Sequence, residues 1–284
     1  MKLSVILPCF NAAATLERQL DALMAQVWDQ AWEVVVADDR SSDQTLAIAR
    51  RYEKWPRLKV ICVEGRHGTA HVINAGIRAS TGESIALCNA DDEVGPGWVA
   101  AMGEALERHE FVSGCLEQTK LNPPWLQWPQ QDRGLQGLWY PPFVPHAGGC
   151  SLGFTRSTYD RVGPFDESLG NLEDTDYCIR VQLSGIPLVF VPGAIVHYRR
   201  RSTLRGLFEQ ACSYAEWNAV IARRNDPADG TAQRFYGIFF IEWARLVRDV
   251  RKLGSMGGRV AWCWRLGFQV GRLKGWVRRS GIPV

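Results

Sequence analysis

The feature that most constrains the fold of this chain is the regular alternation of short β-branched runs with helical patterns between residues 3 and 115. The runs that have the composition of buried strands lie at 4–7, 34–36, 58–63, 84–88 and 111–112. The segments between them carry apolar residues at helical spacing, for example Leu16, Leu20 and Leu23. Strands and helices in alternation predict an α/β fold, with a mainly parallel sheet, flanking helices and right-handed crossovers.

Polar residues follow several of these predicted strands. They occupy 8–11 after the first strand, 38–43 after the second and 89–93 after the fourth. In open parallel sheets, ligands bind at the carboxyl ends of the strands. The acids at two such ends, Asp38 with Asp39 and Asp91 with Asp92, would repel each other unless a cation or a donor-rich ligand lay between them. Each pair alone also fits a turn or a helix cap, but two pairs at one edge favour a ligand site.

Several candidates further along the chain have both a functional and a structural interpretation. The segment 118–147 is rich in Pro, Gln and Trp, and its Trp139 would either stack on a sugar ring or be buried beneath a surface loop. Glu173 and Asp174 begin a predicted helix, where acids commonly stabilise the helix dipole. His197 follows an apolar run, a position where a histidine is most often structural. Their order after the two acidic clusters is what makes them site candidates.

The charge of the chain is unevenly distributed. From Arg199 to the end there are 17 Lys and Arg against 6 Asp and Glu, so of the totals of 33 and 30, the preceding part holds 16 and 24. Helical patterns in the basic part carry Trp262, Trp264, Trp276, Arg265, Arg272 and Arg279. We therefore expect an α/β domain at 1–200 and a basic helical region at 201–284. That region suits either an anionic membrane surface or an appendage with solvated arginines. Nucleic acid binding is not expected, because no known module accompanies the charge.

The cysteines and the apolar runs bear on the compartment. The eight cysteines stand singly, without the close spacing of zinc or redox sites, which favours a reducing compartment. The apolar run before Pro8 is too short for a signal peptide, and no run approaches the roughly 18 apolar residues that span a bilayer. We expect a cytoplasmic protein, bound at most peripherally to the inner face of the cell membrane.

Taken together, the motifs of residues 3–200 resemble glycosyltransferase family 2, the inverting enzymes of the GT-A fold, in their non-processive form. The matching stretches are VILPCFN at 5–11, VADDRSSD at 36–43, NAG at 74–76, TGE at 81–83, NADD at 89–92, GPFDE at 163–167 and EDTD at 173–176. Each stretch alone is weak, whereas their joint occurrence in this order is specific. The resemblance implies a Rossmann-like GT-A domain that carries a C-terminal helical appendage.

The resemblance also implies a role for each matching residue. The nucleotide would be bound by Pro8, Phe10, Asn11, Asp38, Asp39, Asn74, Asn89 and Asp91. The donor sugar or the acceptor would lie near Asp92, Gly148, Gly149 and Trp139. Asp91 and His197 would bind Mn²⁺ or Mg²⁺, and Asp174, beside Glu173, would be the general base.

One residue departs from the family pattern. Asn89 stands where the Asp-x-Asp signature has its first acid, so an amide that can hydrogen-bond a ribose hydroxyl replaces a charge. Hard divalent cations often bind one or two carboxylates together with phosphates, so Asp91 remains compatible with a metal site. Asp92 stands next to Asp91 and can take over part of the missing role.

The activity that the resemblance implies is sugar transfer from a UDP- or dTDP-linked donor to a glycan or lipid-linked glycan hydroxyl, in the assembly of cell-envelope polysaccharide or glycolipid. Two alternatives stay open. A sugar nucleotidyltransferase would also use an α/β nucleotide-binding domain, but its glycine-rich loop is absent at 8–11. A catalytically impaired nucleotide-sugar-binding relative is suggested by Asn89 alone, whereas the acids at 91, 92, 173 and 174 favour activity.

Overall fold

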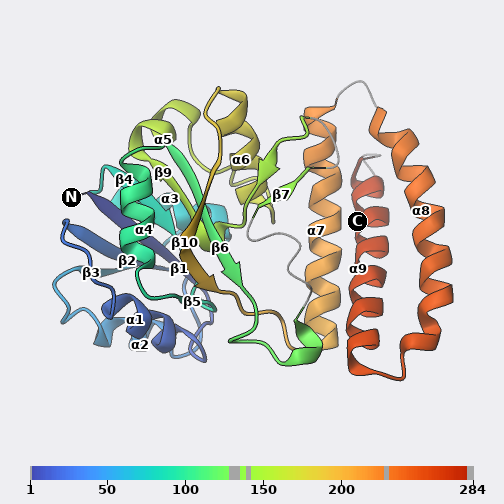
Figure 1. Cartoon of the computed structure of the whole chain (residues 1–284), viewed down its shortest axis with the longest axis horizontal. Coiled ribbons are helices and arrows are strands. Elements are labelled where there is room, and N and C mark those ends of the chain that lie inside the picture. Colours follow the sequence, from blue (N-terminus) through green and yellow to red (C-terminus); the bar gives the residue numbers. More distant parts are fainter. Residues whose placement is uncertain (1, 128–134, 139–141, 227–229, 280–284) are drawn as a thin grey trace. The chain divides into compact units, whose positions relative to one another are not determined.

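The structure is a computed structural model that describes residues 2–127, 135–138, 142–226 and 230–279, and at 230–239 and 278–279 it describes the backbone alone. The chain divides into two compact units (Figure 1). The first comprises residues 1–120, 130–137 and 145–199, and the second comprises 121–129, 138–144 and 200–284. Two short segments from the middle of the chain therefore belong to the same unit as its C-terminal part.

A mixed sheet of eight strands forms the centre of the first unit, in the order β3-β2-β1-β4-β9-β6-β10-β5. In chain order the strands are β1 (Leu3–Cys9), β2 (Trp32–Asp38), β3 (Leu58–Cys62), β4 (Ser84–Leu87), β5 (Glu93–Val94), β6 (Phe111–Glu117), β9 (Leu152–Thr155) and β10 (Val189–His197). A separate two-stranded ribbon pairs β7 (Gln136–Gly137) with β8 (Pro145–His146). The predicted alternation of strands and helices is confirmed for the part of the chain before β6.

The sheet is parallel except at two strands. β1 pairs in parallel with β2 and β4, β2 with β3, and β6 with β10. β9 runs antiparallel between β4 and β6, and β5 runs antiparallel to β10. Because β9 reverses between two strands of like direction, the carboxyl ends of β1, β2, β4, β6 and β10 still meet at one edge. The last strand, β10, pairs with β6 in a register that shifts between Val191 and Ile195.

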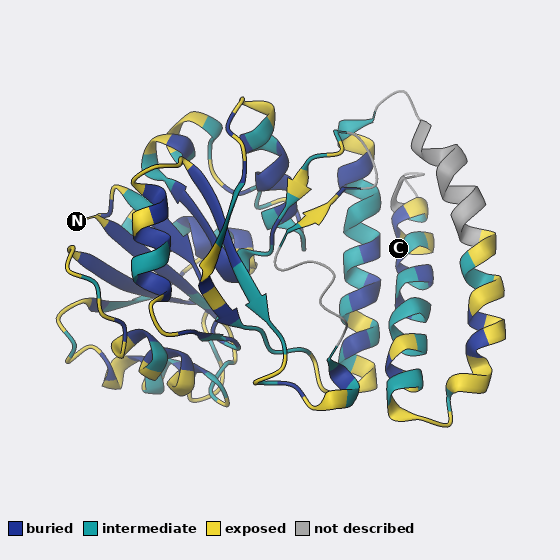
Figure 2. Cartoon of the chain, in the orientation of Figure 1, coloured by how far each residue is buried: buried dark blue, intermediate teal, exposed yellow. Residues whose placement is uncertain are grey.

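Helices cover both faces of the sheet (Figures 1 and 2). Alternate residues of a strand point to opposite faces, so Val5 and Leu7 of β1 pack in one core cluster and Ile6 in another. The first cluster includes buried residues of α1 (Leu16–Met24), α2 (Thr45–Arg51) and α4 (Trp98–Leu106). The second includes residues of α3 (Thr69–Ala79) and α6 (Glu173–Leu183), with α5 (Arg156–Val162) packed against it. Nearly every residue of β1 and β2 is buried, as parallel strands between two helical layers require.

Three helices, α7 (Leu204–Asn225), α8 (Gly230–Asp249) and α9 (Met256–Arg279), make up most of the second unit. A one-turn segment, η3 (Val250–Lys252), follows α8, and another, η1 (Pro124–Leu126), packs its Leu126 with Leu207 and Val260. The side chain of Asp249 ties α8 to α9 through Arg265. None of the helices in the described ranges is long and apolar enough to cross a membrane.

Glycines on α9 let its backbone approach that of α7 closely. A Cβ atom at Gly267 would lie 2.6 Å from the Phe208 carbonyl oxygen, and one at Gly271 would lie 2.0 Å from the Cys212 carbonyl oxygen. At Gly275 it would lie 2.7 Å from the Cβ atom of Ala219. These glycines recur every four residues and so line one side of the helix, which we call the glycine seam. Since the obstacles are mainly backbone atoms, the interface cannot admit a side chain without moving the two helices apart.

We expect Gly271→Val to destabilise the second unit by at least about 2 kcal/mol, because overpacking a rigid interface forces backbone shifts. The measurement is urea denaturation followed by far-ultraviolet circular dichroism. Gly254→Ala is the matched control, since no atom lies within 4 Å of the position its Cβ would take. Equal midpoints for the two variants would show that α7 and α9 do not pack along the glycine seam.

Candidate active site

The end of β2 brings Asp38 to the carboxyl edge of the sheet, beside Cys9 at the end of β1. The Asp38 side chain is buried, and its Oδ2 accepts a hydrogen bond from the Ser41 amide at 3.1 Å. Its Oδ1 is also buried and has no hydrogen-bond partner among the residues that the structure describes. A buried carboxylate oxygen without a donor is costly, so a ligand with an N–H or O–H group would be stabilised there.

The next residue, Asp39, is held by the loop that follows β3. Its Oδ1 lies 3.0 Å from His67 Nδ1, and its Oδ2 accepts from the Gly68 amide at 3.1 Å. The ring of His67 in turn lies 5.8 Å from the exposed ring of Phe10. His67 is not among the site residues predicted from the sequence, although the rule that ligands bind at strand ends applies to the end of β3 as it does to β1 and β2.

Asn11 connects the loops after β1 and β2. Its backbone is in the left-handed region, with φ of 46°, which asparagine tolerates better than most residues. The backbone N–H of Asn11 donates to Ser41 Oγ at 2.9 Å, and its side-chain Oδ1 accepts from the backbone N–H of Ser42 at 2.8 Å. Pro8 lies within β1, one residue before its end. These contacts give Asn11 a part in holding Phe10 and Asp38 near each other.

The side chain of Asn74 is hydrogen-bonded to three other residues of the protein. Its Oδ1 accepts from the Phe165 amide and the Tyr159 hydroxyl, and its Nδ2 donates to the Phe165 carbonyl and to Glu167. These four bonds use all the donors and acceptors of the buried amide. Asn74 thus holds the GPFDE segment against α3, and its part in nucleotide binding stays a prediction.

The segment 89–94, here called the acid loop, follows β4, includes the short strand β5 and carries Asp91 and Asp92. Asp92 is buried, and its Oδ1 accepts from the Arg199 amide at 2.7 Å. Asp91 is part-exposed, and its carbonyl accepts from Arg199 Nε at 2.9 Å. Asn89 is also part-exposed. Of the two adjacent acids, Asp91 is thus the more accessible to a ligand.

His197 ends β10 and is in register with Glu117 on β6 and with Glu93 on β5. Its Nδ1 lies 2.7 Å from Glu117 Oε2. Burial acts to raise the pKa of Glu117, but hydrogen bonds from Thr119, His197 and Lys120 lower it to about 2. An ionised Glu117 accepts from Nδ1–H, so the neutral imidazole keeps its lone pair on Nε2, the arrangement found when a histidine binds metal. Glu117 is not among the site residues predicted from the sequence, because its partner His197 lies 80 residues away along the chain.

These residues fit a divalent cation that is shared with a ligand. In the described part of the chain, no three His, Cys, Asp or Glu side chains form a group that would hold a metal alone. Asp91 and His197 supply one accessible carboxylate and one oriented imidazole. Hard cations such as Mg²⁺ commonly take few protein ligands and complete their shell with phosphate oxygens and water. The donor set is therefore compatible with metal held jointly by protein and diphosphate.

Asp174 lies in the first turn of α6 and is fixed by two backbone amides. Its Oδ2 accepts from Gly149 at 2.7 Å and its Oδ1 from Thr175 at 2.7 Å. Burial, and then the neighbouring Asp174 carboxylate, raise the pKa of Glu173 above its usual range. Gly148 and Gly149 lie against Asp174. A Cβ atom at these two positions would lie 3.9 Å and 3.7 Å from the Oδ2 atom of Asp174, which is an ordinary van der Waals distance. Steric crowding by Asp174 therefore does not require glycine, and Trp139 lies outside the described residues.

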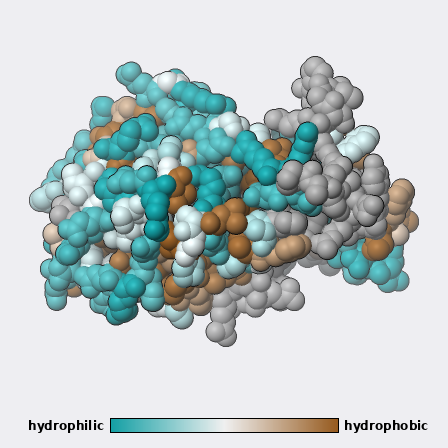
Figure 3. Space-filling model, turned by 90° about the horizontal axis from the view of Figure 1, so that it is seen from above, coloured by the Kyte–Doolittle hydropathy of each residue, from teal (hydrophilic) through white to brown (hydrophobic). Residues whose placement is uncertain are grey.

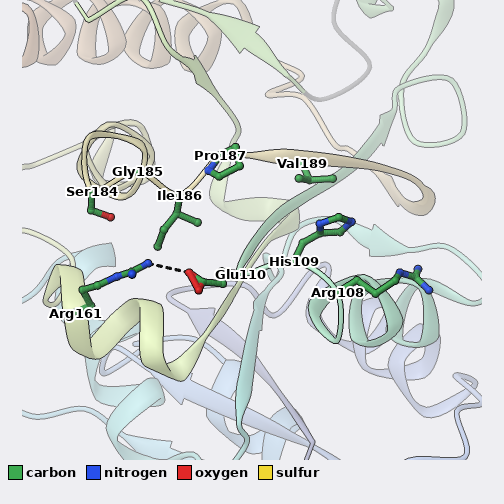
Figure 4. Close-up of a pocket in the computed structure, with 9 residues that line it drawn as sticks. All are labelled: Arg108, His109, Glu110, Arg161, Ser184, Gly185, Ile186, Pro187 and Val189. Atoms are coloured by element: carbon green, nitrogen blue, oxygen red, sulfur yellow. Dashed lines mark hydrogen bonds and ion pairs between the residues drawn. The ribbon is translucent and has the colours of Figure 1, made fainter.

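A pocket of about 400 Å³ lies at the opposite end of the sheet, next to the starts of β6 and β10 (Figure 4). Arg108 and His109 line it, together with an ion pair between Arg161 and Glu110 at 2.8 Å. The carboxyl ends of the strands, with Asp38, Asp91 and His197, are at the other edge. We assign the pocket no part in the candidate active site.

Two proteins similar in sequence are described as uncharacterized glycosyltransferases. YibD of Escherichia coli is 34% identical over 116 residues, which are 40% of this chain and 33% of that protein. YwdF of Bacillus subtilis is 23% identical over 196 residues, which are 63% of this chain and 68% of that protein. The match to YibD thus spans about a third of that relative's length.

Solved structures share the fold. The mannosyltransferase PcManGT from Pyrobaculum calidifontis, in complex with GDP-Man and Mn²⁺, gives a TM-score of 0.59 at 20% identity, covering 92% of this chain and 85% of that one. S. aureus TarS 1-349, in complex with UDP-GlcNAc, gives 0.58 at 18% identity, covering 99% and 93%. The predicted GT-A fold, with its C-terminal helices, is confirmed.

The family model described as glycosyl transferase family 2 matches residues 4–163, which is more than half of the 284 residues. The matched range contains the motifs at 5–11, 36–43, 74–83 and 89–92 on which the resemblance was based. It ends before Asp174 and His197. The resemblance is confirmed, and the chain belongs to glycosyl transferase family 2.

Proposed function

We propose that this protein is an inverting glycosyltransferase that moves a sugar from a nucleoside diphosphate donor to an acceptor hydroxyl. The observation that carries the proposal is the gathering of three different groups at one edge of the sheet. These are the buried carboxylate of Asp38, the pair of Asp91 and His197, and the amide-held carboxylate of Asp174. A nucleotide, a diphosphate and a reacting sugar need such groups in that order.

The nucleotide would bind at the ends of β1, β2 and β3. The buried Oδ1 of Asp38, which has no partner among the described residues, suits a ring N–H such as the imide of uracil or thymine. Phe10 offers an exposed ring on which a base can stack, and Asp39 offers carboxylate oxygens to a ribose. Two relatives of this fold were solved with UDP-GlcNAc and with GDP-Man, whose bases both carry a ring N–H donor. A UDP- or dTDP-linked sugar is the donor we propose.

The diphosphate would lie beside Asp91 and His197, which would hold Mn²⁺ or Mg²⁺ with it. The metal would neutralise charge that develops on the leaving diphosphate. The amide of Asn89 would then serve the ribose or a phosphate through hydrogen bonds rather than through charge. Asp92, tied to the Arg199 amide, supports the acid loop and adds negative charge near the metal.

Asp174 would act as the general base. As the acceptor oxygen bonds to the anomeric carbon, its proton passes to a carboxylate oxygen of Asp174 while the bond from that carbon to the diphosphate oxygen breaks. Attack on the face opposite the leaving group inverts the anomeric centre. The amides of Gly149 and Thr175 hold this carboxylate in one orientation before the acceptor arrives.

Asp174→Asn should lower kcat by at least about a hundredfold, because a positioned base contributes roughly 10²–10⁴-fold. Nucleotide affinity should stay within a few-fold, since the amide retains the size of the carboxylate. Steady-state kinetics measure kcat with the sugar donor that nucleotide screening identifies, and calorimetry measures nucleotide affinity. Asp176→Asn is the control, as it removes a carboxylate from the same helix turn that pairs with Arg180 instead. Unchanged turnover in the Asp174 variant would rule out this residue as the base.

A thermal-shift panel of nucleoside diphosphates, with and without Mn²⁺, should show stabilisation by a uridine or deoxythymidine diphosphate that increases with metal. A ligand at about 100 times its Kd adds about 2.7 kcal/mol, which such a scan resolves. Asp91→Asn should abolish the metal-dependent part of the shift and keep the metal-independent part. The absence of any response in the wild-type protein would contradict nucleotide binding and would favour an impaired relative.

We also propose that the acceptor is a lipid-linked glycan and that the second unit rests on an anionic membrane surface. The C-terminal half of α8 exposes Phe240, Ile241 and Val247 by 69%, 54% and 73%. These side chains, with Arg245, Arg248 and Lys252 close by, form what we call the α8 face. On the side of the molecule in Figure 3, apolar side chains of the described helical region reach the surface beside polar ones. Exposed apolar groups flanked by cations are typical of helices that lie in the headgroup region.

The arginine row foreseen on α9 has different surroundings. Arg265 pairs with Asp249, and burial lowers the pKa of Arg272, which is largely enclosed. The side chain of Arg279 lies outside the described residues. Asp249 also pairs with Arg248 and Lys252, so three cations share one carboxylate and the α8 face keeps an excess of positive charge. That excess complements phosphatidylglycerol headgroups.

The double variant Phe240→Ser/Val247→Ser should bind phosphatidylglycerol vesicles at least about tenfold more weakly in a sedimentation assay, because each lost apolar contact is worth on the order of 1.5–3 kcal/mol when fully buried. Val27→Ser removes a side chain that is 78% exposed in the first unit and should change nothing. Equal binding by the double variant and the wild type would refute the α8 face as a membrane contact.

A further inference from the structure

A buried glutamine is hydrogen-bonded to both ends of the acid loop. Gln19 of α1 has no exposed surface, and its Nε2 donates to the Asn89 carbonyl at 2.9 Å. Its Oε1 accepts from the Val94 amide, also at 2.9 Å. One side-chain amide thus bridges the first and the last residue of the segment that carries Asp91 and Asp92.

The bridge satisfies backbone groups at the point where the sheet pairing is interrupted. β4 ends at Leu87, and β5 pairs with β10 only at Glu93 and Val94. Buried backbone donors and acceptors outside such ladders need side-chain partners. An apolar residue at position 19 would leave the carbonyl of Asn89 and the amide of Val94 without the partner that each has now.

The middle of the acid loop is held from the other side. The Arg199 amide donates to Asp92 Oδ1, and Arg199 Nε donates to the Asp91 carbonyl. Gln19 binds the ends of the acid loop and Arg199 binds its centre, so these hydrogen bonds hold the loop backbone in a single conformation. The Asp91 carboxylate takes part in none of these loop-holding bonds, while the Asp92 carboxylate does.

We propose that Gln19 is a positioning residue for the metal and diphosphate site, and that it acts by fixing the Asp91 carboxylate in its binding orientation. This inference rests on the proposed function. Because Asn89 removes one negative charge from the site, cation affinity depends more strongly on the placement of Asp91. Gln19 touches neither substrate nor metal, and its effect reaches them through the backbone of the acid loop.

A second buried glutamine offers a matched control. Gln26 lies just after the end of α1 and is 8% exposed, and its Nε2 donates to the Gly95 carbonyl and to the Ala22 carbonyl, each at 3.0 Å. Its Oε1 accepts from the Val99 amide at 3.2 Å. Gln26 therefore also bridges a backbone carbonyl and a backbone amide from a buried position, but it holds the start of α4 instead of the acid loop.

The test measures Mn²⁺ binding by electron paramagnetic resonance, with saturating UDP, for the wild type, Gln19→Met and Gln26→Met. Methionine keeps the volume of glutamine and removes its side-chain hydrogen bonds, two at Gln19 and three at Gln26, so the melting temperature should fall in both variants. We expect Mn²⁺ affinity to fall about tenfold in Gln19→Met, as for changes to groups that support metal ligands, and less than twofold in Gln26→Met. If Gln19→Met does not fold, Gln19→Asn takes its place in the test. Asparagine keeps an amide in the core but is too short to reach both ends of the acid loop, so this variant should weaken Mn²⁺ binding in the same way.

Two outcomes separate this inference from the function beneath it. Equal Mn²⁺ affinity in Gln19→Met and Gln26→Met, with a wild type that binds the metal, would overturn the positioning role and leave the proposed function standing. A wild type that binds no Mn²⁺ in the presence of any nucleoside diphosphate would overturn the metal site, and the role of Gln19 with it.

Discussion

Most strands that reach the carboxyl edge of the sheet end in buried or half-buried residues, and the need to satisfy the backbone groups there governs the site. Polar side chains meet the need: Asp38 accepts from the Ser41 amide, Asp39 from Gly68, and Asp174 from Gly149 and Thr175. The carboxylates of Asp38, Asp39 and Asp174, which we assign to ligand binding or catalysis, are therefore also structural acceptors. Each one is held in place before a ligand arrives, which lowers the cost of ordering the site on binding.

The sequence predicted the strands, the edge at which ligands should bind and most of the acids there, because these depend on local patterns. Hydrophobic periodicity identifies β1 to β4, and their loops follow directly. Glu117, Gln19 and the partners of Asn74 depend on contacts across 70 residues or more. A glutamine in a helix gives no local sign that it bridges two loop ends. The reversal of β9 was missed for the same reason, since a short apolar run has the same composition in either direction.

His67 marks the boundary between these cases. It follows the third strand, so the rule that selected Asp38 and Asp91 applies to it equally. Its exposed ring meets Asp39 and Phe10 only because the loop after β3 turns back over β2 and β1. A candidate can therefore be named from strand ends alone, whereas its partners follow from the order of strands in the sheet.

The second unit obeys a different constraint, since its interface between α7 and α9 is built from backbone contact along Gly267, Gly271 and Gly275. An α-helix turns by about 100° per residue. One residue inserted into α9 ahead of Gly267 would carry all three glycines away from α7 and bring bulkier neighbours into their place. Substitutions on the outer side of α9 leave this contact intact, but changes of length do not. Insertions or deletions between the start of α9 and Gly267 are therefore tolerated in evolution only if the facing surface of α7 changes as well.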